Sequence, residues 1–226
     1  QGMPSLTDFE LSLEGCQRTA TMSPSGQLLN EDGLARGIVG LTRLSTFTLN
    51  LSHITQLASV AWLGKSFNAL TNLKMLAINL SLCSWLPSLN GLGGGLGHLS
   101  ALTSFKLSLR WCERLTNLDE LGRGLAHLLA LRELVLDLSH CTQLSSLDGL
   151  CKGFGQLIGL ETLVLSLSNC TGLMHLDELA KGLKSHTALK KLRLDLQSCP
   201  ALTTSHKTLY TSLDDFLAAT QAESGA

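Results

Sequence analysis

Leucine recurs along this chain in one pattern, LxxLxLxLSxCxxL, which fits seven successive segments. If each segment is numbered from its first leucine, positions 1, 4, 6 and 8 hold leucine everywhere except at Phe9, Phe47, Ile78 and Phe105. The alternation at positions 4, 6 and 8 predicts a β-strand with one buried face. The later part of each segment, such as LDELGRGLAHL at 118–128, has the three-to-four spacing of a helix. Each segment is therefore expected to form one strand, one turn and one helix.

The seven segments are evenly spaced, and they begin at Leu6, Leu44, Leu73, Leu102, Leu131, Leu160 and Leu189. The last six starts are 29 residues apart, whereas the first interval is 38 residues long, which predicts a loop insertion at 17–27. One segment cannot bury its own leucines, so neighbouring segments must stack. The sequence thus predicts a single α/β solenoid domain over 1–226, a horseshoe with a parallel β-sheet on the concave side and helices on the convex side. Residues 203–226 break the pattern and are expected to form a C-terminal cap and tail.

The repeated motif resembles that of the leucine-rich-repeat family over residues 6 to about 217. The Cys-x-x-Leu step is similar to the cysteine-containing class, and the 29-residue period with a helical outer segment is similar to ribonuclease-inhibitor-like repeats. The core LxxLxLxLSxC is two residues longer than the usual LxxLxLxxC. The resemblance implies a domain that binds other proteins.

Six of the seven cysteines share position 11, namely Cys16, Cys83, Cys112, Cys141, Cys170 and Cys199. Zinc sites need close pairs of ligands, which this spacing does not offer. In-register side chains on parallel strands point the same way, so disulfides between them are not expected. We expect buried, reduced thiols that donate to backbone carbonyls, which favours an intracellular compartment. Cys151 lies outside this column and is the better candidate for a reactive thiol.

Two further columns look chemical but have structural explanations. Asp32, Asp119, Asp148 and Asp177 precede the predicted helices, where carboxylates could bind a cation but are expected to cap helix N-termini. Glycines recur in register, and their expected role is to let adjacent helices approach closely. They are Gly37, Gly95, Gly124, Gly153 and Gly182.

The composition excludes several classes of partner. The formal net charge is −1 with acids and bases interleaved, so no basic surface is expected for nucleic acid. No apolar stretch is long enough to span a membrane, and no signal peptide precedes the first segment. Because the chain begins with Gln1, we expect a processed protein or a piece of a longer array. The seven histidines are scattered, so no catalytic, cofactor or metal site is predicted.

Binding is therefore expected on the exposed side of the sheet. If positions 4, 6 and 8 point inward, positions 3, 5, 7 and 9 face solvent, and position 10 lies on the rim. Arginine and tryptophan are enriched at the centres of protein interfaces. The predicted protein-binding residues are Lys106, Arg110, Trp111, Glu133, Asp137, His140, Lys191 and Arg193. An ordinary solvated polar sheet would show a similar mixture, and that interpretation stays open.

Two functions are compatible with these features. The first is a non-catalytic protein-interaction scaffold, or an accessory structural subunit of a larger assembly, that works without a cofactor. The second is a regulatory or targeting domain of a larger enzyme, such as a kinase or a ubiquitin-ligase adaptor. No F-box segment precedes the repeats in this chain, so the ubiquitin-ligase hypothesis has no support of its own.

Overall fold

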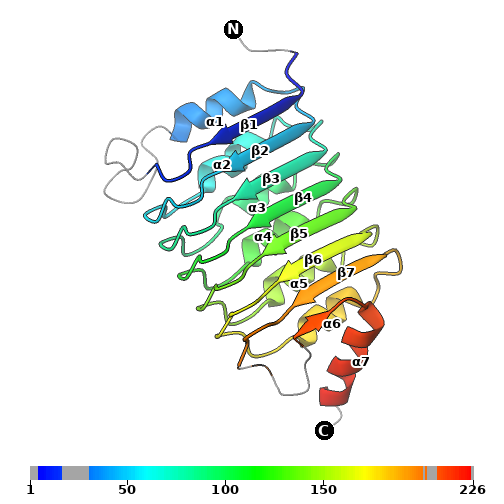
Figure 1. The fold of residues 1–226 in the computed structure, drawn as a ribbon. Coiled ribbons are helices and arrows are strands. Elements are labelled where there is room, and N and C mark those ends of the chain that lie inside the picture. Colours follow the sequence, from blue (N-terminus) through cyan, green and yellow to red (C-terminus); the bar gives the residue numbers. More distant parts are fainter. Residues whose placement is uncertain (1–4, 17–30, 201, 203–207, 225–226) are drawn as a thin grey trace.

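The computed structural model describes residues 5–16, 31–200, 202 and 208–224. Seven short strands alternate with six short helices, and a two-residue strand and a longer helix follow (Figure 1). The strands are β1 (Asp8–Ser12), β2 (Thr46–Asn50), β3 (Met75–Asn79), β4 (Ser104–Ser108), β5 (Glu133–Asp137), β6 (Thr162–Ser166), β7 (Lys191–Asp195) and β8 (Leu209–Tyr210). The helices are α1 (Glu31–Val39), α2 (Ala61–Phe67), α3 (Leu92–Leu96), α4 (Asp119–Leu125), α5 (Asp148–Phe154), α6 (Asp177–Leu183) and α7 (Leu213–Ser224).

One sheet runs the length of the molecule with its strands in chain order from β1 to β8. The first seven strands are parallel, and their register joins identical repeat positions, for example Phe47 to Leu76 and Leu76 to Phe105. The pairing of Phe9 with Phe47 shows that the long first interval does not shift the register. The predicted parallel α/β solenoid is therefore confirmed. The predicted insertion at 17–27 lies outside the described residues.

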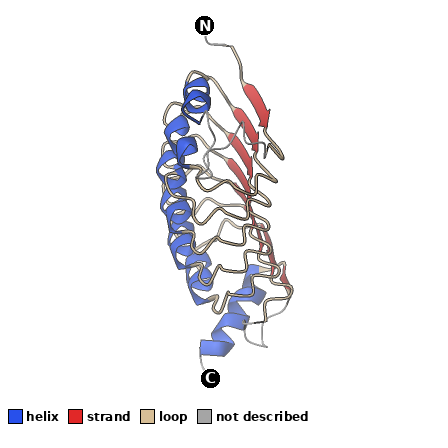
Figure 2. Cartoon of the chain, turned by 90° about the vertical axis from the view of Figure 1, so that its left-hand side faces the viewer, coloured by secondary structure: helices blue, strands red, loops and turns tan. Residues whose placement is uncertain are grey.

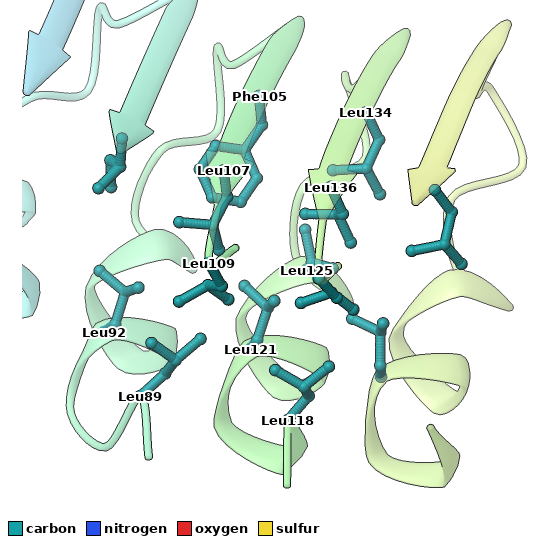
Figure 3. Packing of buried hydrophobic residues seen from close by; sticks show 14 of the residues in the cluster. Leu89, Leu92, Phe105, Leu107, Leu109, Leu118, Leu121, Leu125, Leu134 and Leu136 are labelled. Carbon is teal, nitrogen blue, oxygen red and sulfur yellow. The ribbon is translucent and has the colours of Figure 1, made fainter. Parts of the chain in front are cut away.

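The helices α1 to α6 form a second layer on one side of the sheet, and the other side of the sheet carries no helix layer (Figure 2). The leucines at positions 4, 6 and 8 point into the space between the two layers, where the helix leucines meet them (Figure 3). Leu107, Leu134 and Leu136 are at most 2% exposed. At about 25 cal/mol per Å² of buried apolar surface, this shared layer is the main favourable contribution to folding.

Each strand spans positions 3 to 7, one residue earlier than the alternation at positions 4, 6 and 8 suggests. The hydrogen-bond ladder nevertheless continues into the turn: Leu109 N–H donates to Asp137 O at 2.7 Å and Trp111 N–H to Ser139 O at 2.9 Å. Position 10 between them has a positive φ in every repeat, which is 63° at Trp111. Gly15 occupies this position in the first repeat, while the other six repeats place a larger residue there.

The four inner thiols of the column are buried, as predicted, whereas Cys16 and Cys199 at its ends are partly exposed. Each of the five later members donates to the position-8 carbonyl of the preceding repeat, as Cys112 Sγ does to Leu80 O at 3.2 Å and Cys141 Sγ to Leu109 O at 3.2 Å. All the cysteines are free. Burial raises the pKa of Cys83 to about 12 and that of Cys112 still further, so these thiols stay protonated and serve as donors.

Adjacent helices approach so closely that the predicted glycine column leaves no room for side chains. This holds for Gly95, Gly124, Gly153 and Gly182 but not for Gly37. A Cβ atom at Gly124 would overlap the backbone of Gly93, and one at Gly153 would overlap Gly122. A Cβ at Gly37, by contrast, would meet nothing within 4 Å. Position 21 forms a second glycine column that the sequence analysis missed, in which Gly64, Gly93 and Gly122 face backbone carbonyls of the next repeat.

The capping role predicted for the aspartates is wrong. Asp119, Asp148 and Asp177 are the first residues of α4, α5 and α6, and the residues before them make no side-chain cap. In two repeats the backbone N–H of the aspartate instead donates to a side-chain oxygen two positions earlier. For example, Asp148 N–H donates to Ser146 Oγ at 2.9 Å. The carboxylates still lie at the positive end of the helix dipole, where a negative charge is favourable.

The described part of the predicted cap forms β8 and α7 at the end of the array (Figure 1). Strand β8 pairs antiparallel with β7 through Leu194 and Tyr210, so it ends the parallel repeat. Tyr210 packs edge-on against Phe216 of α7 with ring centroids 5.3 Å apart, and both side chains are buried. This aromatic pair covers the last leucine layer.

Candidate protein-interaction surface

The side of the sheet opposite the helices presents three side chains per strand, at positions 3, 5 and 7. We call these residues of β1 to β7 the open face. They are all at least partly exposed except Ser104, which is 8% exposed. Because positions 4 and 6 point toward the helices, the residues of the open face do not contribute to the leucine core. Their side chains are available for recognition.

Charge is unevenly distributed along the open face. Asp8 and Glu10 of β1 are exposed at one end, whereas Lys191 and Arg193 of β7 are exposed at the other. Between these ends lie mainly small polar and apolar residues. A shallow depression of about 400 Å³ crosses β1 to β5 and includes Lys106 in its lining. This hollow, whose lining mixes polar residues such as Asn79 with apolar ones such as Ala77, can accommodate side chains of another protein.

Lys106 and Glu133 form the one charged pair between adjacent strands of the open face among the described residues. Lys106 Nζ lies 3.4 Å from Glu133 Oε1, and Ser104 Oγ donates to Glu133 Oε2 at 2.6 Å. The hydrogen bond from Ser104, followed by the charges of Lys106 and Lys191, holds the pKa of Glu133 below its ordinary value despite partial desolvation. Glu133 also covers Ser104, which explains why this position-3 side chain is buried rather than exposed as predicted.

Asp137 has a backbone role that the sequence analysis did not anticipate. Its Oδ1 accepts a hydrogen bond from Ser139 N–H at 3.0 Å. The equivalent side chains of Asn50, Asn79 and Asp195 likewise accept from the backbone N–H two residues later. These bonds turn the chain away from the strand at position 9. Position 9 therefore does not belong to the open face, and Ser139 there is only 8% exposed, contrary to the prediction.

Arg110, Trp111 and His140 lie on the turns that follow β4 and β5, not on the open face. The rings of Trp111 and His140 stack with centroids 3.7 Å apart and planes 10° apart. Asn169 Nδ2 in the next turn lies 3.4 Å from His140 Nε2, so the row extends over three repeats. Arg110 is exposed beside them.

The predicted site residues therefore divide between two surfaces. Lys106, Glu133 and Asp137 lie together on adjacent strands β4 and β5 of the open face. Lys191 and Arg193 belong to the same face but to β7, where Arg193 Nη2 lies 3.8 Å from Asp195 Oδ2. Arg110, Trp111 and His140 lie on the turns that follow β4 and β5. Trp111 and His140 were predicted on the rim, whereas Arg110, at position 9, was wrongly predicted to face solvent from the strand itself.

Two further exposed residues that were not predicted, Trp85 and Arg114, lie on the turns that follow β3 and β4. Trp85 is 49% exposed, and the guanidinium carbon of Arg114 lies 6.0 Å from its ring centroid. Both occupy position 13, in repeats three and four, and a position-by-position comparison of the repeats would have found them. The same column holds Gln56, Gln143, Gly172 and Ala201 in repeats two, five, six and seven, and Arg18 in the first.

Chemically reactive groups are sparse in the described part of the chain. Cys151 is 3% exposed, and burial raises the pKa of its thiol to about 12, so the prediction of a reactive thiol there is wrong. Within residues 5–16, 31–200, 202 and 208–224, no cluster of His, Cys, Asp and Glu could hold a metal ion. In the same ranges, no helix is both long and apolar enough to cross a membrane.

The repeated strand-turn-helix unit, its fixed register and its single parallel sheet together decide the fold class. The chain has a leucine-rich-repeat-like fold. No family model and no curated protein matches the sequence. Among solved structures, the chain is similar to internalin C2 from Listeria monocytogenes, with 21% sequence identity and a TM-score of 0.44. That similarity covers 85% of this chain and 68% of the internalin chain.

Proposed function

We propose that this protein is a non-catalytic interaction module that binds another protein through the open face, either as a scaffold or as an accessory subunit of a larger assembly. The observation that carries the proposal is the depression over β1 to β5, whose lining includes Lys106 and Val135. A leucine-rich-repeat-like fold supports a role in protein binding because its sheet offers a broad surface whose residues are free of the core.

The contact centre that we propose is the Lys106–Glu133 pair with Val135 beside it. The ion pair is partly exposed on both sides, at 47% and 36%, so its contribution to folding stability is small. A partner that covers it would remove it from water and strengthen its electrostatic interactions. Val135 offers apolar area next to the pair. Lys191 and Arg193 would contact a partner long enough to reach β7.

Site-specific photo-crosslinking tests this proposal. Benzoylphenylalanine in place of Val135 or Ala77, both on the open face, should capture the same partner polypeptide in the cells that make the protein. The matched control is Lys152, which is exposed on α5 in the helix layer and should capture no such partner. The proposal would be abandoned if the Lys152 position captured that polypeptide as efficiently as the open face did.

Charge reversal supplies the second part of the test. Lys106→Glu should reduce the yield of the crosslinked partner by about tenfold, which corresponds to about 1.4 kcal/mol of binding free energy. The melting temperature should change little because the side chain is exposed. Lys152→Glu makes the same charge change on the other side and should leave the yield intact. An unchanged yield for Lys106→Glu would remove this residue from the contact centre.

A further inference from the structure

The turns that follow β3, β4 and β5 bring two tryptophans, two arginines and a histidine to one edge of the sheet. We call this group the turn-edge patch, and its members are Trp85, Arg110, Trp111, Arg114 and His140. Repeat four supplies the central three residues, and the ring contacts connect it to repeats three and five. The patch is separate from the open face because its residues occupy positions 9, 10 and 13, in the turns that follow the strands.

The ring of Trp111 is held in place before any partner arrives. Trp111 N–H donates to Ser139 O at 2.9 Å, while Arg110 O accepts from Leu82 N–H at 2.7 Å, so both neighbouring turns fix the backbone of the central one. The positive φ of Trp111, 63°, is a costly conformation for a bulky residue, and the ladder maintains it. The stack on His140 then fixes the ring. Little side-chain entropy remains to be lost on binding.

The two arginines of the patch carry charge that the described part of the chain does not neutralise. Within the described ranges, neither Arg110 nor Arg114 has a carboxylate within ion-pair distance, and the same holds for other exposed cations such as Lys65 and Lys152. Both arginines are exposed. Glu113 is the exposed carboxylate between them in the same turn. The patch is thus aromatic with a net positive charge, in a chain whose overall charge is −1.

We propose that the turn-edge patch binds a short acidic peptide segment of another protein. Carboxylates of the segment would pair with Arg110 and Arg114, whose planar guanidinium groups bind them in a bidentate manner. Apolar side chains between those acids would lie on the rings of Trp85 and Trp111. A nucleic acid fits less well, because two arginines do not form the extended row of cations that a phosphate backbone needs. This inference does not depend on the function proposed for the open face.

Selection from a library of phage-displayed random dodecapeptides tests the proposal on the whole protein. Peptides enriched on the wild-type protein should contain two or more Asp or Glu residues interleaved with aromatic or aliphatic residues. The same library selected on the Arg110→Glu and Arg114→Glu double variant should lose these sequences. Enrichment of basic or uncharged peptides, or persistence of the acidic ones on the double variant, would overturn the proposal.

An affinity measurement on the most enriched peptide completes the test. By fluorescence anisotropy, the double variant and Trp111→Ala should each weaken binding at least tenfold. The matched control is the Lys152→Glu and Lys184→Glu double variant, which makes the same charge change at exposed helix-side positions and should bind within about twofold of wild type. Equal weakening by the control would reduce the effect to net charge and refute the patch. A single-stranded oligonucleotide that competed with the peptide would refute the choice of partner class.

Discussion

His186 is a polar residue in a column that the other repeats fill with leucine. Position 27 holds Leu70, Leu99, Leu128 and Leu157 in repeats two to five, and all four are buried. His186 is only 2% exposed, and neither ring nitrogen has a hydrogen-bond partner. A buried polar group without a partner destabilises the folded state by about 1 to 3 kcal/mol. Burial, only partly opposed by nearby backbone carbonyls, lowers the pKa of this imidazole from its ordinary value of 6.5.

We expect His186→Leu to raise the free energy of unfolding and to reduce its dependence on pH. The histidine is neutral in both states well above pH 6.5, so its charge costs nothing there. As the pH falls below 6.5 toward the lower pKa of the folded state, the unfolded chain binds the proton more readily and stability is lost. Urea unfolding should therefore show a gain of about 1 to 3 kcal/mol at neutral pH and a larger gain at pH 5.

His127→Leu is the matched control, since His127 is exposed on the helix side of repeat four. It should leave both the stability and its acid dependence close to those of the wild-type protein. If the wild-type protein and His186→Leu lost the same amount of stability between pH 8 and pH 5, His186 would not be the group that titrates.

Single residues are also where prediction from the sequence was weakest. The leucine pattern correctly identifies core residues such as Leu136, because burial follows directly from a two-residue period. It does not reveal that position 10 has a positive φ, because Leu82 and Trp111 are residues that rarely adopt this conformation. The available signals were Gly15 in the first repeat and Asn169, His53 and His140 in the same column, since these residue types adopt a positive φ more readily. The neighbours impose the conformation through the ladder, and such tertiary effects are not visible in a local pattern.

At the level of the helices, backbone contact takes the place of side-chain packing. In α3 and α4, the residues at positions 21 and 23 are glycine, and the helix backbones approach within the space that a Cβ would need. The two helices are only five and seven residues long. Helices this short are unstable alone, so they depend on packing against both the sheet and one another.

Gly122→Ala and Gly94→Ala should have opposite effects on stability. A Cβ at Gly122 would overlap the Gly149 carbonyl, so the substitution forces α4 and α5 apart and should cost about 1 to 3 kcal/mol or more. A Cβ at Gly94 would meet nothing within 4 Å, so alanine there should gain up to about 1 kcal/mol from its higher helix propensity. Thermal unfolding followed by circular dichroism measures both. If Gly122→Ala left the melting temperature unchanged, α4 and α5 would have to be farther apart than in the structure.

The sequence gives the helices less reliably than the strands. Their leucine spacing and one glycine column were recognised, but their first residues were not, because an aspartate is equally suited to the N-cap and to the first turn. Ser146, which binds the N–H of Asp148, was the better indication of where a helix begins. The second glycine column was missed because Cys151 and Ala180 replace glycine in later repeats.

For the whole molecule, the fixed register predicts a sharp difference between neighbouring residues of β5. Leu136 is fully buried, so Leu136→Asp would place an unpaired charge in the shared core and should abolish cooperative folding. Val135 points to the open face, so Val135→Asp should leave the melting temperature within a few degrees of wild type. Differential scanning calorimetry distinguishes them, and similar melting curves for the two variants would contradict the register.

Five of the six junctions between repeats use the same atoms, since a thiol donates to a carbonyl one repeat earlier beside the strand pairing. A gene encoding such a chain can gain or lose a unit of 29 residues by unequal recombination, and the new neighbours meet with a compatible interface. Strand β8 and helix α7, which follow the last parallel strand, do not follow the repeat. Length is therefore a property on which natural selection can act separately from the composition of any one layer.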